Sequence, residues 1–226
     1  MAKKKGVTAF EMSEIDRRAR EEYGISQTLL MENAGKSVAE VVLNDYPSLE
    51  KERIACFCGK GNNGGDGYVV ARYLAFKKPQ ELIIYAVDAD KIKAGAANDN
   101  YILARERGIK IYPLEQFFLI DEKKEFFTIA VDALFGTGFK GELPDFCITL
   151  GKKLNSLNIK TYAVDIPSGL DATTGLAVKY VPKAKKTITF GLTKKGFFIK
   201  DGPSVCGEVI VKDIGFPQKL LSEYTT

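Results

Sequence analysis

The chain of 226 residues contains no histidine. Proton transfer must therefore use aspartate, glutamate, lysine, tyrosine, cysteine or water, and Ser-His-Asp and Cys-His catalysis are excluded. The four cysteines form no C-x-x-C pair, so the usual zinc spacings are excluded as well, and we expect buried, reduced thiols. The net charge of +4, from 33 basic and 29 acidic residues, is too small to indicate an obligate nucleic-acid binder.

Long apolar runs are also missing. None approaches the roughly 20 residues of a membrane helix, and the basic start "MAKKKG" is followed by charged residues where a signal peptide needs an apolar core. We therefore expect a soluble, cytoplasmic protein. The length suits a single domain over residues 1–226.

Two patterns of periodicity divide the chain. Thr8 and Glu11 have capping-box spacing and Ser26 can open a second helix, so helices are predicted within residues 8–45. In residues 52–226, apolar strands alternate with amphipathic helices. The expected strands are residues 53–58, 82–87, 109–114, 127–136 and 159–169, followed by two short edge strands at 186–191 and 207–215. Such strands indicate a doubly wound α/β sandwich with a parallel sheet covered on both faces.

Ligands of such sheets bind at the carboxyl ends of the strands, near the point where the strand order reverses. This rule selects residues 59–67, Asp88, residues 132–142 and residues 165–175. Each of these segments lies where an apolar strand gives way to a polar, glycine-containing turn. We therefore expect the functional side chains there.

The segment "GKGNNGGDG" at residues 59–67 allows several interpretations. It lacks the lysine of a phosphate-binding P-loop. A dinucleotide cradle would use Gly59, Gly61 and Gly64, with Asp88 as a loose candidate for ribose recognition. The pattern G-x-G-x-x-G alone is weak evidence.

The side chains of the same segment favour a third interpretation. Asn62 and Asn63 can donate to a ligand and can present neutral oxygens to a hard cation. Asp66 would suit the start of a helix predicted at residues 66–76, but it would compete with a phosphate for the same amides. An Asx-rich turn that only caps this helix stays open as the structural alternative.

Two later strands end in aspartate. Asp132 follows "FTIAV" and Asp165 follows "KTYAV", so both carboxylates should lie at the ligand edge, as general acid/base groups or cation ligands. A helix-capping role stays open for Asp132. Ser168 follows Asp165 by three residues. Lys140, in the glycine-rich "GTGFKGELP", is suited to phosphate, with an ordinary surface loop as the alternative.

Four motifs together point to a known family: "MSEIDRRAREEYGISQTLLMENAGKSVAEVV", "GKGNNGGDGYVVARYL", "VDALFGTGFKGELP" and "VDIPSGLDATTG". Over residues 12–175 the chain resembles the NAD(P)H-hydrate epimerase family, the stand-alone form of the YjeF N-terminal domain. The resemblance implies a Rossmann-like three-layer αβα sandwich with a mostly parallel sheet, a homodimer and a bound potassium ion (K+). It also implies epimerisation of the R and S forms of hydrated NADH and NADPH in nicotinamide cofactor repair. A separate ADP- or ATP-dependent hydrate dehydratase would act alongside, since the sequence has no room for that second domain.

The resemblance also implies roles for individual residues. The hydrated nucleotide would contact Asn62, Asn63, Gly64, Gly65, Asp66, Gly136, Thr137, Gly138, Phe139, Lys140, Gly141, Glu142 and Asp165. Potassium would be held by Asn63, Asp132 and Ser168, and oxygen ligands of this kind suit a hard cation. Our hypothesis is that the ring nitrogen helps expel the hydroxyl and that water adds again from the other face. Asp165 or Asp132 would handle the protons, while Lys140 would orient phosphate or stabilise charge.

A non-catalytic nucleotide- or RNA-binding dimeric scaffold of the same fold is the alternative. Its basic surface could be built from Lys185, Lys186, Lys194 and Lys195, although we expect these lysines on an ordinary solvated face. The three intact loop motifs argue against a scaffold, so no nucleic-acid partner is expected. A conventional dehydrogenase is a weaker alternative that should bind unmodified NAD tightly. The amphipathic N-terminal helices are the candidate dimer surface.

Overall fold

A single sheet dominates the computed structural model, which describes residues 6–120, 126–138, 144–157 and 159–225. Its seven strands are all parallel to their neighbours and have the order β3-β2-β1-β4-β5-β6-β7. They are β1 (Arg53–Cys58), β2 (Glu81–Ala86), β3 (Lys110–Pro113), β4 (Ile129–Ala133), β5 (Lys160–Val164), β6 (Lys186–Phe190) and β7 (Glu208–Lys212). The predicted α/β sandwich with a mostly parallel sheet is confirmed, and the two C-terminal strands extend one edge as expected.

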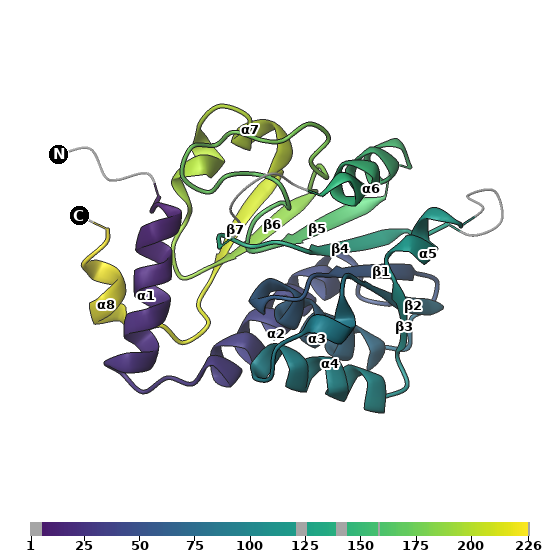
Figure 1. The fold of residues 1–226 in the computed structure, drawn as a ribbon, viewed down its shortest axis with the longest axis horizontal. Coiled ribbons are helices and arrows are strands. Elements are labelled where there is room, and N and C mark those ends of the chain that lie inside the picture. Colours follow the sequence, from purple (N-terminus) through teal and green to yellow (C-terminus); the bar gives the residue numbers. More distant parts are fainter. Residues whose placement is uncertain (1–5, 121–125, 139–143, 158, 226) are drawn as a thin grey trace.

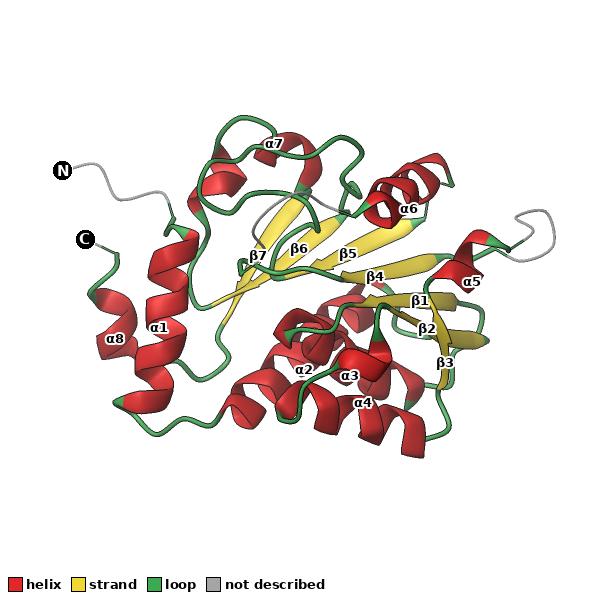
Figure 2. Cartoon of the chain, viewed as in Figure 1, coloured by secondary structure: helices red, strands yellow, loops and turns green. Residues whose placement is uncertain are grey.

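Helices lie on both faces of this sheet (Figures 1 and 2). They are α1 (Ala9–Glu21), α2 (Gln27–Asp45), α3 (Asn62–Ala75), α4 (Ala96–Glu106), α5 (Glu115–Phe118), α6 (Asp145–Ser156), α7 (Gly202–Val205) and α8 (Gln218–Ser222). The layer of α2, α3 and α4 covers one face, and α5 and α6 cover the other. In the described part of the chain, no helix has the length and apolarity needed to cross a membrane.

Alternation along the strands explains the two layers. In β1, Ile54, Cys56 and Cys58 pack in the core that includes α2 and α3, whereas Ala55 and Phe57 pack in the core that includes α6. Neighbouring strand residues point to opposite faces, so a strand buried on both sides is apolar throughout. All four cysteines are buried and free, as the sequence predicts.

The N-terminal helices begin where the sequence predicts. Thr8 caps α1 through a reciprocal capping box with Glu11, and the Ser26 side chain accepts from the Leu29 amide at the start of α2. Helix α1 lies at the β7 end of the molecule, beside α8 (Figure 1).

Helix α3 differs from expectation, because it begins at Asn62 and not at Asp66. Its N-cap, Gly61, makes no side-chain capping bond. Asparagine and glycine are poor helix formers, so the first turn of this helix cannot be recognised from the sequence. Tertiary packing stabilises it. The "NNGGD" residues therefore lie in the first turns of a helix, and the Asx-rich capping turn is wrong.

Candidate active site at the carboxyl end of the sheet

The order of the strands reverses between β1 and β4. The Gly59 amide donates to the Ala133 carbonyl at 3.1 Å and so joins the ends of these two strands. A Cβ atom on Gly59 would lie 2.0 Å from the Leu134 carbonyl oxygen, and one on Gly64 would lie 1.8 Å from the Gly59 oxygen. Only glycine allows this close approach, so the start of α3 is held against Gly59 at the end of β1, and Gly59 is held against the residue that follows β4.

Asp132 is the first polar group at this point. It has no solvent exposure. One carboxylate oxygen accepts from the Ser168 hydroxyl at 2.5 Å and from the Leu134 amide at 3.4 Å, and the other accepts from the Ser168 amide at 2.8 Å. Burial raises the pKa of Asp132, while the hydrogen bonds from Ser168 and Leu134 oppose that rise. The carboxylate bridges the loops after β4 and β5.

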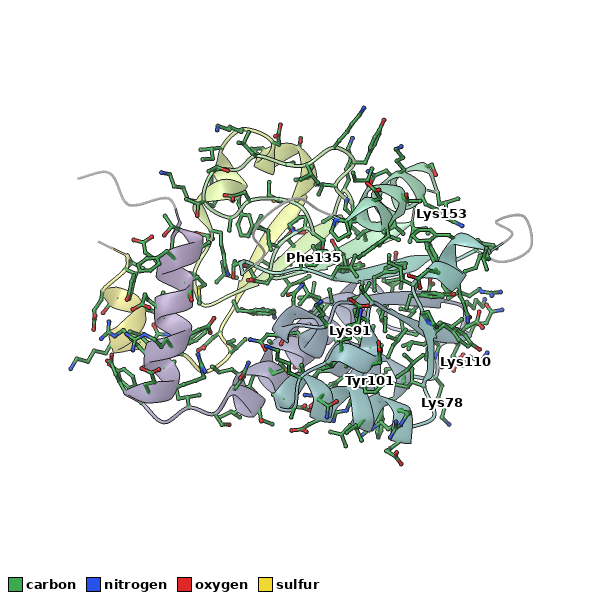
Figure 3. The ribbon with its side chains drawn as sticks, in the orientation of Figure 1. Lys78, Lys91, Tyr101, Lys110, Phe135 and Lys153 are labelled. Atoms are coloured by element: carbon green, nitrogen blue, oxygen red, sulfur yellow. The ribbon has the colours of Figure 1, made fainter. Side chains whose placement is uncertain are left out.

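Asn63 lies beside the same loop. The nitrogen of its side-chain amide, Nδ2, is buried and has no hydrogen-bond partner in the described part of the protein. A Cβ on Gly136 would lie 3.2 Å from its Oδ1 atom. The preceding Phe135, labelled in Figure 3, donates its amide to the Ser168 hydroxyl at 3.0 Å. The three predicted potassium ligands are therefore gathered around residues 134–136.

This donor set restricts the kind of metal that could bind. Among the residues that the structure describes, no group of three or more His, Cys, Asp or Glu side chains could hold a metal ion. The set has one carboxylate (Asp132), one hydroxyl (Ser168) and one amide (Asn63). Rotation of the Asn63 side-chain amide by half a turn would present its oxygen where the unpartnered nitrogen lies. Such oxygen ligands fit a hard cation better than zinc.

Asp165 follows β5 and has a left-handed backbone, with φ of 64°. Its amide donates to the Ile188 carbonyl at 2.7 Å. Its Oδ1 atom accepts from the Lys194 ammonium at 2.6 Å and from the Thr189 hydroxyl at 3.1 Å. Lys194 has no solvent exposure and also donates to Thr189 at 2.6 Å and to the Phe190 carbonyl at 3.2 Å. An ion pair between a fully buried lysine and a nearly buried aspartate thus lies at the ends of β5 and β6.

Two further carboxyl groups lie within electrostatic range of Asp165. Burial raises the pKa of Asp66, on α3, well above its usual value, and the charges of Asp165 and Asp16 add to the rise. Burial also raises the pKa of Asp16, on α1, to about 6; Asp165 adds to that rise, whereas Lys194 and Arg20 oppose it. Helices α1 and α3 therefore both contribute acids to the surroundings of Asp165.

The structure brings several of the predicted site residues together. Asn63, Asp132 and Ser168 gather at the end of β4, as predicted. Phe139, Lys140, Gly141 and Glu142 lie outside the described residues, so their predicted roles stay predictions.

Two residues were missed by sequence reasoning. Asp16 lies between the buried Ile15 and Ala19 of α1. An acidic residue beside the apolar face of a helix was the available sign that this carboxyl group is partly buried. Lys194 was expected on a solvated face, which is wrong, because it is completely buried against Asp165. Lys194 follows closely the carboxyl end of β6, and this position, which also selected Asp165, was the available sign that it lies near the site.

The other lysines considered for a basic surface lie in different parts of the fold. Lys185 and Lys186 pair with Asp45 at 2.8 and 2.7 Å, where β5 and β6 begin. Tyr162 also donates to Asp45, at 2.6 Å. These lysines therefore lie at the amino edge of the sheet, and together with the buried Lys194 they do not form one basic patch.

A small apolar pocket of about 50 Å³ lies away from this site. Its lining consists of Phe117, Ile120, Phe126, Phe127, Lys153, Leu157 and Ile159. Phe127 and Ile159 precede β4 and β5, so the pocket lies at the amino ends of these strands. Figure 3 labels Lys153, on α6, at the same side of the molecule. The polar groups considered above do not line it.

Known proteins resemble this chain over nearly its full length. It is 38% identical over 219 residues to the bifunctional NAD(P)H-hydrate repair enzyme Nnr of Moorella thermoacetica, covering 96% of this chain and 41% of that protein. The chain thus spans about two fifths of the length of the bifunctional relatives. It is 36% identical over 223 residues to the NAD(P)H-hydrate epimerase of Elusimicrobium minutum, covering 97% of this chain and 99% of that protein.

A solved structure and a family model agree with these relatives. The crystal structure of the yeast protein ynu0 superposes with a TM-score of 0.79 at 21% identity, covering 98% of this chain and 93% of that one, and so supports the fold. The family model described as "YjeF-related protein N-terminus" matches residues 27–196, which include every site residue identified above except Asp16. This chain therefore belongs to the family of YjeF-related protein N-termini.

Proposed function

We propose that the chain epimerises the R and S forms of hydrated NADH and NADPH. The relative that it covers almost completely carries the name NAD(P)H-hydrate epimerase. The observation that carries the proposal is the pair of buried aspartates at the ends of β4 and β5, beside the reversal of the strand order. Ligands of doubly wound sheets bind at this point.

The chemistry needs no change of oxidation state. In the hydrate, one carbon bears both a hydroxyl and the ring nitrogen. The nitrogen lone pair helps expel the hydroxyl, which takes up a proton and leaves as water. The resulting planar cation adds water from the opposite face, and that water loses a proton. One group that gives and then takes back a proton therefore suffices.

Asp165 is the better candidate for this group. In the described part of the chain, both its hydrogen-bonding partners use Oδ1, so Oδ2 is free for a substrate. Both oxygens of Asp132 accept hydrogen bonds from the chain. We therefore assign proton transfer to Asp165 and the organisation of the loop to Asp132.

Recognition of the nucleotide would use the first turn of α3. Its free amides can bind a phosphate at the positive end of the helix dipole. Burial raises the pKa of Asp66 well above its usual value, which favours the neutral form of this side chain. The competition between this side chain and phosphate, expected from the sequence, is thereby reduced. Asn62 is exposed and Asn63 is buried, so each can present its amide to a different part of the ligand.

Potassium is part of the proposal. Asn63, Asp132 and Ser168 would hold it, and the unpartnered Asn63 amide supports this choice. A cation there would supply positive charge next to the buried carboxylate of Asp132. The other roles in the proposed site, nucleotide binding and proton transfer, would be carried out by the chain's own groups.

Three wider statements complete the proposal. Several relatives are named bifunctional NAD(P)H-hydrate repair enzymes, which supports a dehydratase as the partner activity. A homodimer through the N-terminal helices would cover Phe10 and Leu29, which are 74% and 52% exposed. A cytoplasmic location is supported by four free thiols, because disulfides are rare in reducing compartments. No observation favours the RNA-binding scaffold.

The test uses the pure R form of hydrated NADH. Chromatography follows its conversion to the R/S mixture with and without potassium, against the uncatalysed rate. We expect the protein to accelerate the conversion, Asp165→Asn to lose at least about 100-fold of this acceleration, and Ser168→Ala to lose the response to potassium. Asp90→Asn, at an exposed position, is the matched control. An active Asp165→Asn variant would overturn the assignment, and an inactive folded wild type would overturn the function.

A further inference from the structure

We propose that Lys194 is a positioning residue for Asp165, which it holds in the orientation that proton transfer requires. The inference rests on the proposed epimerase function. Its basis is the completely buried ammonium 2.6 Å from Asp165 Oδ1. Nothing in the function requires this lysine to touch the substrate.

Two hydrogen bonds hold one oxygen of the Asp165 carboxylate. Lys194 and Thr189 both donate to Oδ1, and Lys194 also donates to Thr189. The three groups thus form a closed triangle, which restricts rotation of the carboxylate. The second oxygen, Oδ2, is then presented in a defined direction. Misplacement of a reacting group by about 1 Å can cost about 100-fold in rate.

The backbone around Lys194 is itself held on both sides by the N-terminal segment. The Val7 amide donates to the Thr193 carbonyl, and the Lys195 amide donates to the Val7 carbonyl, both at 2.8 Å. Val7 and Lys194 thus form a parallel bridge. A Cβ on the adjacent Gly6, which has φ of 82°, would lie 2.6 Å from the Lys194 carbonyl carbon. A segment distant in sequence therefore fixes the position of the ammonium.

Charge explains why a lysine occupies this position. The charge of Asp165 acts on Asp16, on α1, and on Asp66, on α3, and the charge of Arg20 acts on Asp16. Lys194 is the buried cation of this group, and it also opposes the pKa rise of Asp16. A buried ion pair is weak evidence for a gain in stability, because an apolar replacement of both partners is often as stable. Orientation of a working carboxylate accounts for the pair better than stability does.

Steady-state epimerisation of the R form by full-length variants tests the role. We expect Lys194→Met to lower kcat by about 100-fold with KM changed by less than about threefold, since orientation affects the chemical step. We expect Lys194→Ala to show the same loss and to recover about tenfold on addition of propylammonium, which can replace the lost ammonium. Lys195→Met, next in the chain and exposed, is the matched control and should retain wild-type kcat.

A second variant guards against misfolding. Thr189→Val keeps the shape of a buried side chain and removes only the hydroxyl of the triangle. If circular dichroism shows that the Lys194 variants do not fold, a folded Thr189→Val with kcat lowered about tenfold supports the role, and one with wild-type kcat overturns it.

The outcomes separate this inference from the function on which it rests. A wild type that accelerates the reaction together with a folded, fully active Lys194→Met refutes only the positioning role. A raised KM with unchanged kcat also refutes it, because it would mean that Lys194 binds substrate. Loss of kcat without rescue by propylammonium or support from Thr189→Val would leave only a structural role, and would overturn the inference. A folded wild type without acceleration refutes the epimerase, and with it any role of Lys194 in that reaction.

Discussion

Replacement of Asp16 by asparagine should stabilise the protein at neutral and alkaline pH. Asp16 lies next to the buried Ile15 of α1, and burial raises its pKa to about 6. The negative charge of Asp165 adds to this rise, and Lys194 and Arg20 only partly oppose it. The ionised carboxylate is therefore less favourable in the folded protein than in the unfolded chain. Asparagine has a similar shape and no charge.

The size and sign of the effect follow from the two pKa values. The unfolded chain has the ordinary aspartate value of 3.8, and the folded protein has about 6. Well below pH 3.8 the group is neutral in both states and the folded state carries no penalty. Between the two pKa values the penalty grows by about 1.4 kcal/mol for each pH unit, and it reaches about 3 kcal/mol above pH 6. This is an upper bound, because Asp16 keeps some exposure to solvent.

Urea unfolding followed by circular dichroism at pH 4, 5, 6, 7 and 8 measures the effect. The free energy of unfolding of Asp16→Asn should exceed that of wild type by up to about 3 kcal/mol at pH 8, and the difference should fall to about 0.5 kcal/mol at pH 4. Asp90→Asn, at an exposed position, should show no such trend. A difference that is independent of pH, or a variant less stable than wild type at pH 8, would refute the reasoning.

Three other changes have defined outcomes. Ser168→Ala leaves the buried Asp132 carboxylate without its hydroxyl donor, so urea unfolding should show a loss of about 1–3 kcal/mol. Gly64→Ala forces a methyl group to within 1.8 Å of the Gly59 carbonyl oxygen, and a lower melting temperature and loss of the proposed epimerase activity should both result; a variant as stable as wild type would contradict the close approach. Thr8→Ala removes the side-chain cap of α1, so the free energy of unfolding should fall by about 1 kcal/mol; an unchanged urea midpoint would contradict this.

The sheet could be predicted from the sequence because its signal is local. Strands buried on both faces, such as Arg53–Cys58, are nearly continuous apolar runs, and all seven were found. The positions of Asp132 and Asp165 followed from the same signal, because each ends such a run. The start of α3 could not be found, since its first turn consists of poor helix formers that are held by contacts with Gly59 and the end of β4.

The burial of Lys194 could not be predicted for a different physical reason. A pair of lysines in a loop is usually solvated, and the intrinsic properties of Lys194 and Lys195 are the same. Their environments differ because the Gly6–Val7 segment lies across the loop and pairs with the backbone on both sides of Lys194. Contacts between residues so far apart in the chain leave no periodic signal in the sequence.

The N-terminal segment therefore belongs to the site as well as to the fold. The family match begins at residue 27 and omits both the Val7 bridge and Asp16. The bridge fixes the backbone from which Lys194 reaches Asp165, and Asp16 adds negative charge next to the same carboxylate. The segments that follow β1, β4 and β5 supply the polar groups of the motifs seen in the sequence. The orientation and electrostatic surroundings of Asp165, however, depend on residues 6–20, so the sheet and its loops alone do not account for the whole site.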